Sequence, residues 1–201
     1  MNPIFSQYQN EDVRRLIAEY PLAWIISPMA TTSAASLLPL IGKYDAGGTL
    51  IALIGHMAVA NPLNAVFTDN PTAMILFNGP QGYISPNYAG PRNWGPTWNY
   101  ATLRIEAQIH MGKDMTEYAL GVLIDQCEKH LKQPWTATEL EGRYEGLLTF
   151  IIGFEAKIDA LHATFKLGQD EKISIINNII DAHPDPELRT WMQSFKNKDG
   201  L

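Results

Sequence analysis

The polar residues best placed for chemistry lie where a predicted strand gives way to a predicted helix. The strand ends near His56, in the segment 55–62, which reads Gly-His-Met-Ala-Val-Ala-Asn-Pro. Asn61 is suited to cap the helix, with Pro62 at its first position. A helix N-terminus beside a strand end presents N–H groups and a partial positive charge, which suits a phosphate. The alternative interpretation is that Asn61 only caps its helix.

A second candidate is the Pro/Gly/Asn-rich stretch from Ser85 to Trp98, which is too long for a simple turn. Aromatic residues lie on it or beside it, between serine, threonine, asparagine and proline: Tyr83, Tyr88, Trp94, Trp98 and Tyr100. Large flat side chains next to hydrogen-bonding groups resemble the wall of a site for a planar ligand. The alternative is that these aromatics pack the loop down as a lid on the core.

Other familiar catalytic patterns do not occur in the sequence. The histidines have no paired metal spacing, so no metal site is predicted. Cys127 falls on the apolar stripe of a predicted helix, which favours a buried thiol over a nucleophile. Without a glycine-rich nucleotide loop or a Gly-x-Ser-x-Gly motif, the usual dinucleotide-binding, nucleotide-hydrolysing and serine-hydrolase classes are excluded. No general acid or base pair is evident, so no catalytic residue is assigned.

Composition sets the broad class. The chain has 201 residues, of which 46% are hydrophobic and 18% charged, so a single domain over 1–201 is predicted, with helices from about residue 170. The net charge of −6 works against non-specific attraction to nucleic acid or anionic lipid. No apolar run reaches the roughly 20 residues of a membrane helix, and the N-terminus lacks a signal-like pattern. A cytoplasmic location without membrane attachment is predicted.

Short apolar runs and alternating segments predict at least six or seven strands. The clearest is Thr102–Met111, in which apolar residues alternate with polar ones from Leu103 onward. Ile152–Ala160 alternates in the same way. The other predicted strands are 22–27, 36–42, 50–56, 73–77 and 82–85.

Helical spacing predicts a first helix that starts at Asn10, and another that opens at Asp114 with a capping box to Glu117. Two more are predicted to open at Asp170 and Asp185. Because the strands follow one another mostly without alternating helices, the pattern favours an α+β fold. Its antiparallel sheet is expected to close into a small barrel with peripheral helices.

Several motifs follow one another in a specific order. They are Ser-Leu-Leu-Pro-Leu at 36–40, Gly-His-Met-Ala at 55–58 with Ala-Asn-Pro at 60–62, Gly-Pro at 79–80 with Tyr-Ile-Ser-Pro at 83–86, and Pro-Thr-Trp-Asn-Tyr at 96–100. Gly-Phe-Glu at 153–155 and Lys-Leu at 166–167 with Gln169 follow. In this order and spacing they resemble the PaiB-like FMN-binding negative transcriptional regulators, over roughly residues 10 to 180.

The resemblance implies an antiparallel split β-barrel of the flavin-reductase and pyridoxamine-phosphate-oxidase type, a homodimer, and FMN bound between the subunits. His56 and the helix start at Asn61 would approach the FMN phosphate. Ser85 and the segment 97–100 would line the flavin or its dimer contact. The cofactor-binding residues that the resemblance implies are Leu38, Pro39, His56, Asn61, Tyr83, Ser85, Thr97, Trp98, Asn99, Tyr100, Arg104, Lys166 and Gln169.

The chain departs from the family pattern at charged positions. The family has His where Leu37 stands, Arg where Val59 stands and His where Arg104 stands. Charge-assisted donors of this kind are each worth about 1.5–3 kcal/mol. The departures at Leu37 and Val59 therefore predict a lowered FMN affinity, and Arg104 is the candidate to replace part of the lost charge.

Three functions are compatible with the resemblance. The first is an FMN-binding regulator that represses transcription, on DNA directly or through a regulatory partner. The second is an FMN-dependent oxidoreductase that moves a hydride between a nicotinamide donor and a small molecule. The third is a degenerate barrel that has lost FMN and acts as a dimeric binding protein. The acidic net charge counts mildly against direct DNA binding.

Overall fold

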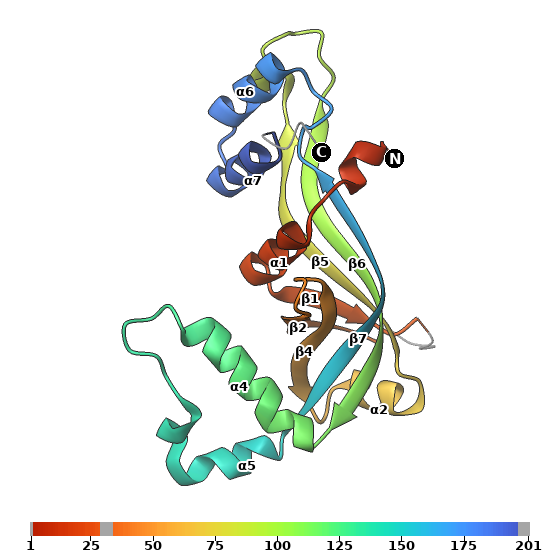
Figure 1. The fold of residues 1–201 in the computed structure, drawn as a ribbon, viewed down its shortest axis with the longest axis vertical. Coiled ribbons are helices and arrows are strands. Elements are labelled where there is room, and N and C mark those ends of the chain that lie inside the picture. The colour runs from red at the N-terminus through yellow and green to blue at the C-terminus, as the bar shows by residue number, and fades with distance from the viewer. Residues whose placement is uncertain (1, 29–33, 197–201) are drawn as a thin grey trace. The chain divides into compact units, whose positions relative to one another are not determined.

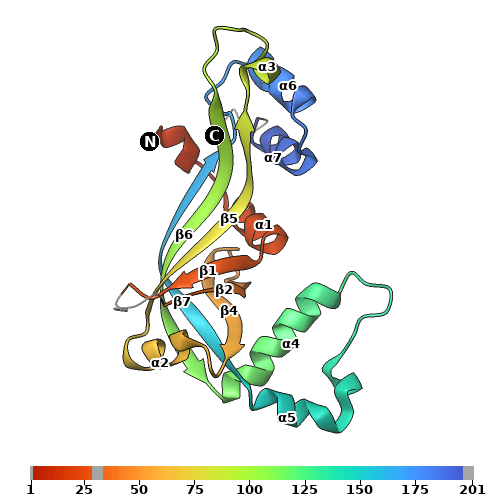
Figure 2. The ribbon, with the colours of Figure 1, turned by 180° about the vertical axis from the view of Figure 1, so that it is seen from behind.

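The computed structural model describes residues 2–28 and 34–196 (Figure 1, Figure 2). It has the α+β fold that the sequence predicts, with seven strands in the order β2-β1-β5-β6-β7-β4-β3. The strands are β1 (Leu22–Ile26), β2 (Ala35–Pro39), β3 (Ile41–Tyr44), β4 (Leu50–Ala58), β5 (Thr72–Ile84), β6 (Thr97–Gly112) and β7 (Ile151–Lys166). The helices are α1 (Asn10–Glu19), α2 (Pro62–Asp69), α3 (Pro86–Ala89), α4 (Asp114–Glu128), α5 (Tyr144–Leu148), α6 (Ile173–Ala182) and α7 (Pro186–Lys196), with 3-10 helices η1 (Pro3–Ser6) and η2 (Ala137–Arg143).

The described residues form two compact units. Unit 1 comprises residues 2–9, 78–103 and 162–196, and unit 2 comprises residues 10–28, 34–77 and 104–161. The strands β5, β6 and β7 each have one end in unit 1 and the other in unit 2. The single domain expected from the sequence stays a prediction.

In unit 2, β4 and β7 form an antiparallel pair in which Gly55 lies opposite Phe154 and His56 lies opposite Gly153. Close packing requires both glycines. A Cβ on Gly55 would lie 2.7 Å from the Phe154 ring, and a Cβ on Gly153 would lie 2.5 Å from the Met115 carbonyl oxygen of α4. These distances are shorter than atoms tolerate, so the Gly-His and Gly-Phe-Glu motifs have a packing role.

The long strand β6 follows the predicted alternation. Its inward side chains are buried, namely Leu103, Ile105, Ala107 and Ile109. The side chains between them point outward, with Arg104, Glu106 and His110 exposed. The strand predicted over 102–111 is therefore confirmed, and it begins earlier, at Thr97.

The core of unit 1 is aromatic. Phe165, near the end of β7, stacks on Phe195 of α7 with ring centroids 4.9 Å apart, and on Trp191 at 6.0 Å. Helix α7 starts as predicted, because the Asp185 carboxylate accepts two backbone N–H groups of its first turn. Helices α6 and α7 contact each other, and α3 contacts α6 beside the ends of β5 and β6 (Figure 2).

Two strand predictions are wrong. In one, the break at Leu40 was not predicted, and in the other, the predicted break at Gly79 and Pro80 does not occur. The segment 36–42 holds two strands, β2 and β3, which are separated at Leu40, whose backbone N–H donates to the Pro21 carbonyl. The predicted break between 77 and 82 does not exist, because β5 continues through Gly79 and Pro80. Glycine and proline predict a turn there, and sheet formation overrides that local preference.

Helix starts are predicted less well where no side chain caps them. Helix α4 begins at Asp114, but its N-cap residue Lys113 makes no side-chain capping bond, so the predicted capping box is wrong. Helix α6 begins at Ile173 rather than at Asp170. The irregular stretch predicted over 85–98 is shorter, because α3 occupies Pro86–Ala89 and β6 begins at Thr97.

The buried thiol predicted at Cys127 is also wrong. Helix α4 buries only Thr116 and Ala119 of its fifteen residues, and Cys127 is exposed. Helical spacing identifies an apolar stripe, but it does not reveal how much of that stripe another element covers.

Candidate functional site

In unit 2, polar side chains link strand β2 to the start of α2. Asn61 caps α2 as predicted, because its Oδ1 accepts the Leu63 N–H at 3.0 Å and Pro62 follows at the first helical position. The Asn61 amide also bonds the Ser36 hydroxyl of β2, at 3.0 to 3.1 Å. We call Ser36 and Asn61 the polar pair. The predicted residues Leu38 and Pro39 lie on the same strand as Ser36 and are half-buried.

His56 lies on β4 and is half-buried. Its Nδ1 is buried and has no hydrogen-bond partner, a feature that only Ser27 Oγ shares among the side-chain atoms of residues 2–28 and 34–196. Burial lowers the pKa of His56, which favours the neutral imidazole. A buried polar atom without a partner calls for an explanation, and a ligand group is one.

The two positions where the family resemblance implies His and Arg are exposed and apolar here. Leu37 of β2 is 47% exposed and Val59, just after β4, is 46% exposed. Leu37 lies opposite Trp24 of β1, which is 43% exposed. Both positions are therefore accessible from solvent, and neither carries a charge.

Arg104, the candidate replacement for that charge, is exposed on β6. Its guanidinium forms an ion pair with Glu106 at 3.0 Å, and both side chains are about half exposed. An adjacent carboxylate offsets much of the attraction that Arg104 would exert on an anion.

In unit 1, aromatic and cationic side chains meet at the ends of β5, β6 and β7. Tyr83 and Trp98 form an edge-to-face pair with ring centroids 6.0 Å apart, and they are 47% and 55% exposed. The Lys166 ammonium donates to the Thr97 hydroxyl at 2.6 Å and to the Trp98 carbonyl at 2.7 Å. We call Tyr83, Trp98 and Lys166 the aromatic cluster.

Lys166 also lines a cavity of about 310 Å³ in unit 1, together with Thr97 and Asn99. Burial lowers the pKa of Lys166, while the carboxylates of Asp170 and Glu171 act to raise it. The ammonium is thus a partly desolvated cation, fixed by hydrogen bonds to Thr97 and Trp98, with the centroid of the Phe5 ring 5.8 Å away.

Other predicted residues of unit 1 use their polar groups within the fold. The buried Asn99 donates to the Met192 sulfur, and Ser85 caps α3 by accepting the Asn87 N–H. Gln169 closes the turn after β7, where it donates to the Phe165 carbonyl and accepts the Leu167 N–H. Tyr100 is half-buried on β6.

Two contacts were not anticipated from the sequence. Ser36 belongs to a recognisable motif, but only the structure pairs it with Asn61. Trp94 donates to Glu171 at 3.2 Å, and both line the 310 Å³ cavity. The partners in such pairs are far apart in the sequence, and no motif at one residue predicts which residue it contacts.

Within the described residues, no group of three or more His, Cys, Asp or Glu side chains is arranged to hold a metal ion. None of the helices in the same part of the chain is long and apolar enough to cross a membrane.

Comparison with known proteins places these features in context. A family model described as "Putative FMN-binding domain" matches residues 1–160. The chain is 26% identical over 179 residues to "Protease synthase and sporulation protein PAI 2" of Bacillus subtilis strain 168, an alignment that covers 88% of this chain and 85% of that protein.

Among solved structures, the fold is similar to that of a FAD and heme binding protein from Mycobacterium smegmatis. The TM-score is 0.58 with 14% identity, over 80% of this chain and 72% of that one. The flavocytochrome Anf3 from Azotobacter vinelandii gives a TM-score of 0.56 with 11% identity, over 80% of this chain and 69% of that one. These neighbours share the antiparallel split-barrel architecture, so the predicted fold class is confirmed.

Proposed function

This chain belongs to the FMN-binding family whose model it matches, and on that premise we propose that it is a homodimeric FMN-binding regulatory protein of the cytoplasm. In this proposal the polar pair and His56 serve the phosphate end of FMN. The aromatic cluster serves the flavin ring or the dimer contact next to it. The remaining residues implied by the family motifs, Leu38, Pro39, Ser85, Thr97, Asn99, Tyr100, Arg104 and Gln169, complete or support the site.

The unpartnered Nδ1 of His56 is the observation that carries the proposal. A phosphate or a phosphate-bound water that reaches this buried atom would satisfy it, and the second N–H of the Asn61 amide supplies a further neutral donor. The donor set therefore fits a phosphate group, but with little formal charge.

The aromatic cluster fits the flavin end. Trp98 and Tyr83 present flat, exposed faces of the kind on which a planar ring stacks. Lys166 donates to the Trp98 backbone carbonyl, and its positive charge attracts the electron-rich edge of a flavin. FMN supplies one- and two-electron redox chemistry when it is bound, while these side chains orient it and shield it from water.

The proposed homodimer rests on the face made by β1 and β2. Leu22, Trp24 and Leu37 are 54%, 43% and 47% exposed there. Strand β2 is at one edge of the sheet order, and an exposed apolar edge strand invites pairing with another chain. Trp24→Glu is expected to give a monomer in size-exclusion chromatography, whereas Leu131→Glu, at an exposed leucine elsewhere in unit 2, is expected to stay dimeric.

The regulatory role rests on the Bacillus subtilis relative, whose name refers to protease synthase and sporulation. In the proposed role, bound FMN biases the dimer toward one state, which acts on transcription through DNA or a protein partner. A nicotinamide-dependent oxidoreductase is the second candidate. It is favoured by the exposure of Tyr83 and Trp98, which leaves room for a second planar reactant.

The test begins with the visible spectrum of the purified protein and an FMN titration. A flavin spectrum that shifts on binding supports the proposal, whereas a colourless protein that leaves the FMN spectrum unchanged refutes both flavin functions and leaves the degenerate barrel. If FMN binds, retardation of DNA from the protein's own upstream region at physiological salt favours the regulator. Steady oxidation of NADH by the purified dimer favours the oxidoreductase.

A further inference from the structure

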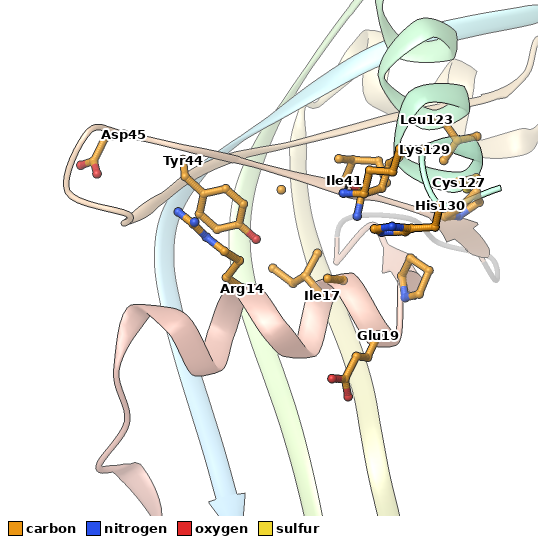
Figure 3. A pocket seen from close by; sticks show the side chains of 15 residues that line it. Arg14, Ile17, Glu19, Ile41, Tyr44, Asp45, Leu123, Cys127, Lys129 and His130 are labelled. Atoms are coloured by element: carbon orange, nitrogen blue, oxygen red, sulfur yellow. Dashed lines mark hydrogen bonds between the residues drawn. The ribbon is translucent and has the colours of Figure 1, made fainter. Parts of the chain in front are cut away.

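Unit 2 contains a cavity that shares only Pro39 with the proposed flavin site. It lies between α1, β3 and the C-terminal half of α4 and has a volume of about 810 Å³. Figure 3 shows Arg14 and Ile17 of α1 facing Tyr44 on one side, and Cys127 and His130 at the end of α4 on the other. This volume is typical of small-molecule sites. Apart from Pro39, none of the residues proposed for FMN lines it.

One wall of the cavity is the Tyr44 ring, which packs between Gly42 and Arg14. Gly42 leaves space for the Tyr44 phenol, because a Cβ at that position would collide with the ring. On the ring face, the Arg14 guanidinium carbon lies 4.5 Å from the ring centroid. Burial raises the pKa of Tyr44 to about 12, so the phenol stays neutral at physiological pH. The wall therefore combines an uncharged aromatic surface with a fixed guanidinium.

The lining has as many carboxylates as permanent cations, but both carboxylates have hydrogen-bonding partners of their own. Of the two carboxylates in its lining, Glu19 pairs with Arg15 at 2.8 Å, and Asp45 accepts two backbone N–H groups of its own turn. The lining also holds Arg14, Lys129 and His130. Outside the lining, Arg14 forms an ion pair with Glu11 at 4.0 Å, and the Glu11 side chain is 75% exposed. Water screens so exposed a pair strongly, which leaves most of the Arg14 charge available.

The rest of the lining is apolar and comes from Ile17, Ala18, Pro21, Ile41 and Leu123. We infer that this cavity binds a small organic anion with an aromatic or other apolar body. The body lies against Tyr44, Ile17 and Leu123, and the carboxylate or sulfonate faces Arg14. Such a ligand would bridge α1 and α4, two elements that line opposite sides of the cavity.

A pair of fluorescent probes tests the inference. Anilinonaphthalene sulfonate carries an anionic group on an aromatic body, and N-phenylnaphthylamine has nearly the same body without the charge. We expect the sulfonate to bind the full-length protein at one site per chain. Arg14→Gln is expected to weaken the sulfonate about tenfold and to leave the neutral probe nearly unchanged. Arg143→Gln, at an exposed arginine outside the cavity, is the matched control.

Two further measurements locate the probe. Ala18 is exposed and lines the cavity, so Ala18→Trp fills the space without disturbing the core and is expected to abolish binding of both probes. Cys127 is the chain's single cysteine, and a saturating concentration of the sulfonate is expected to slow its alkylation by iodoacetamide. Circular dichroism and thermal unfolding verify that each variant is folded.

Three results would overturn the inference: sulfonate affinity unchanged in folded Arg14→Gln and Ala18→Trp, an unchanged alkylation rate at Cys127, or stoichiometric displacement of the probe by FMN. The last would assign the probe to the flavin site. Failure of FMN to bind, in contrast, bears only on the proposed function.

Discussion

The polar pair of unit 2 and the aromatic cluster of unit 1 differ in how their binding groups are used. Ser36 and Asn61 bond each other, and Asn61 also caps its helix, so much of their hydrogen-bonding capacity is spent within the fold. Tyr83 and Trp98 instead leave about half of their surfaces exposed, and Lys166 holds the Trp98 backbone carbonyl. The aromatic cluster therefore offers a ligand more free surface than the polar pair does.

The comparison also bears on specificity. A phosphate held by neutral donors is favoured less strongly than one held by arginine, because charge-assisted hydrogen bonds are about twice as strong. Exposed Leu37 and Val59 make the polar region still less suited to an anion. We therefore expect FMN to be preferred over riboflavin, which lacks the phosphate, by a smaller factor than in relatives with those cations.

The largest expected effect comes from a change confined to unit 2. A Cβ on Gly153 would meet the Met115 carbonyl, and backbone cannot move aside as a flexible side chain does. Gly153→Ala is therefore expected to lower the free energy of unfolding by about 3 kcal/mol in urea denaturation.

Gly121 of α4 provides the matched control, because a Cβ there would meet nothing within 4 Å. Gly121→Ala is expected to raise the free energy of unfolding by about 0.5–1 kcal/mol, the usual gain for alanine inside a helix. Equal effects of the two substitutions would contradict a packing role for Gly153.

Trp98→Ala tests the aromatic side of the comparison. Loss of a stacking surface is expected to weaken FMN by about 1–2 kcal/mol, or roughly 5- to 30-fold, in a fluorescence titration. Trp135→Ala removes a tryptophan from outside both regions and is expected to leave the affinity unchanged. If Trp98→Ala also binds FMN normally, the aromatic residues act only as a lid on the core.

Val59→Arg tests the polar region by placing an arginine where the family resemblance implies one. At an exposed position the gain in FMN affinity is expected to be about 1 kcal/mol, and it should decrease as salt is added. Val59→Gln separates side-chain length from charge and is expected to bind like the natural protein. An arginine variant that also binds riboflavin more tightly would contradict a phosphate contact.

The smallest expected effect is a pH dependence at His56. Burial lowers its pKa in the folded state, so the unfolded chain takes up a proton first as the pH falls. The stability due to neutral His56 is therefore fully present above about pH 6.5 and is lost progressively below it. Melting temperatures of the natural protein and His56→Gln are expected to converge between about pH 7.5 and about pH 5. Parallel curves would exclude this contribution.

Local signals predicted much of the fold. Asn61 and Asp185 cap helices as expected, because a capping side chain bonds N–H groups only two or three residues away. The alternation of β6 identifies its buried face directly. The predictions of a buried Cys127 and of a break at Gly79-Pro80 are wrong. Burial of a helix face and pairing of a strand both depend on segments that are distant in the sequence.

The candidate site was predicted in part. The sequence motifs pointed to Trp98 and Lys166, but the bonds from the Lys166 ammonium to Thr97 and Trp98 join residues nearly 70 positions apart. The unpartnered His56 Nδ1 also needed the structure, since burial of a single ring atom depends on all the elements packed around it.

The order of segments in the two units has a consequence for synthesis. Unit 2 ends at residue 161, whereas unit 1 needs residues 162–196 to supply Phe165, Trp191 and Phe195 for its aromatic core. A growing polypeptide therefore contains all of unit 2 before the ribosome has made the last half of unit 1, and the polar pair can form during translation. The aromatic cluster is complete only after Lys166 has emerged, so under the proposed function flavin capture belongs to the last stage of folding.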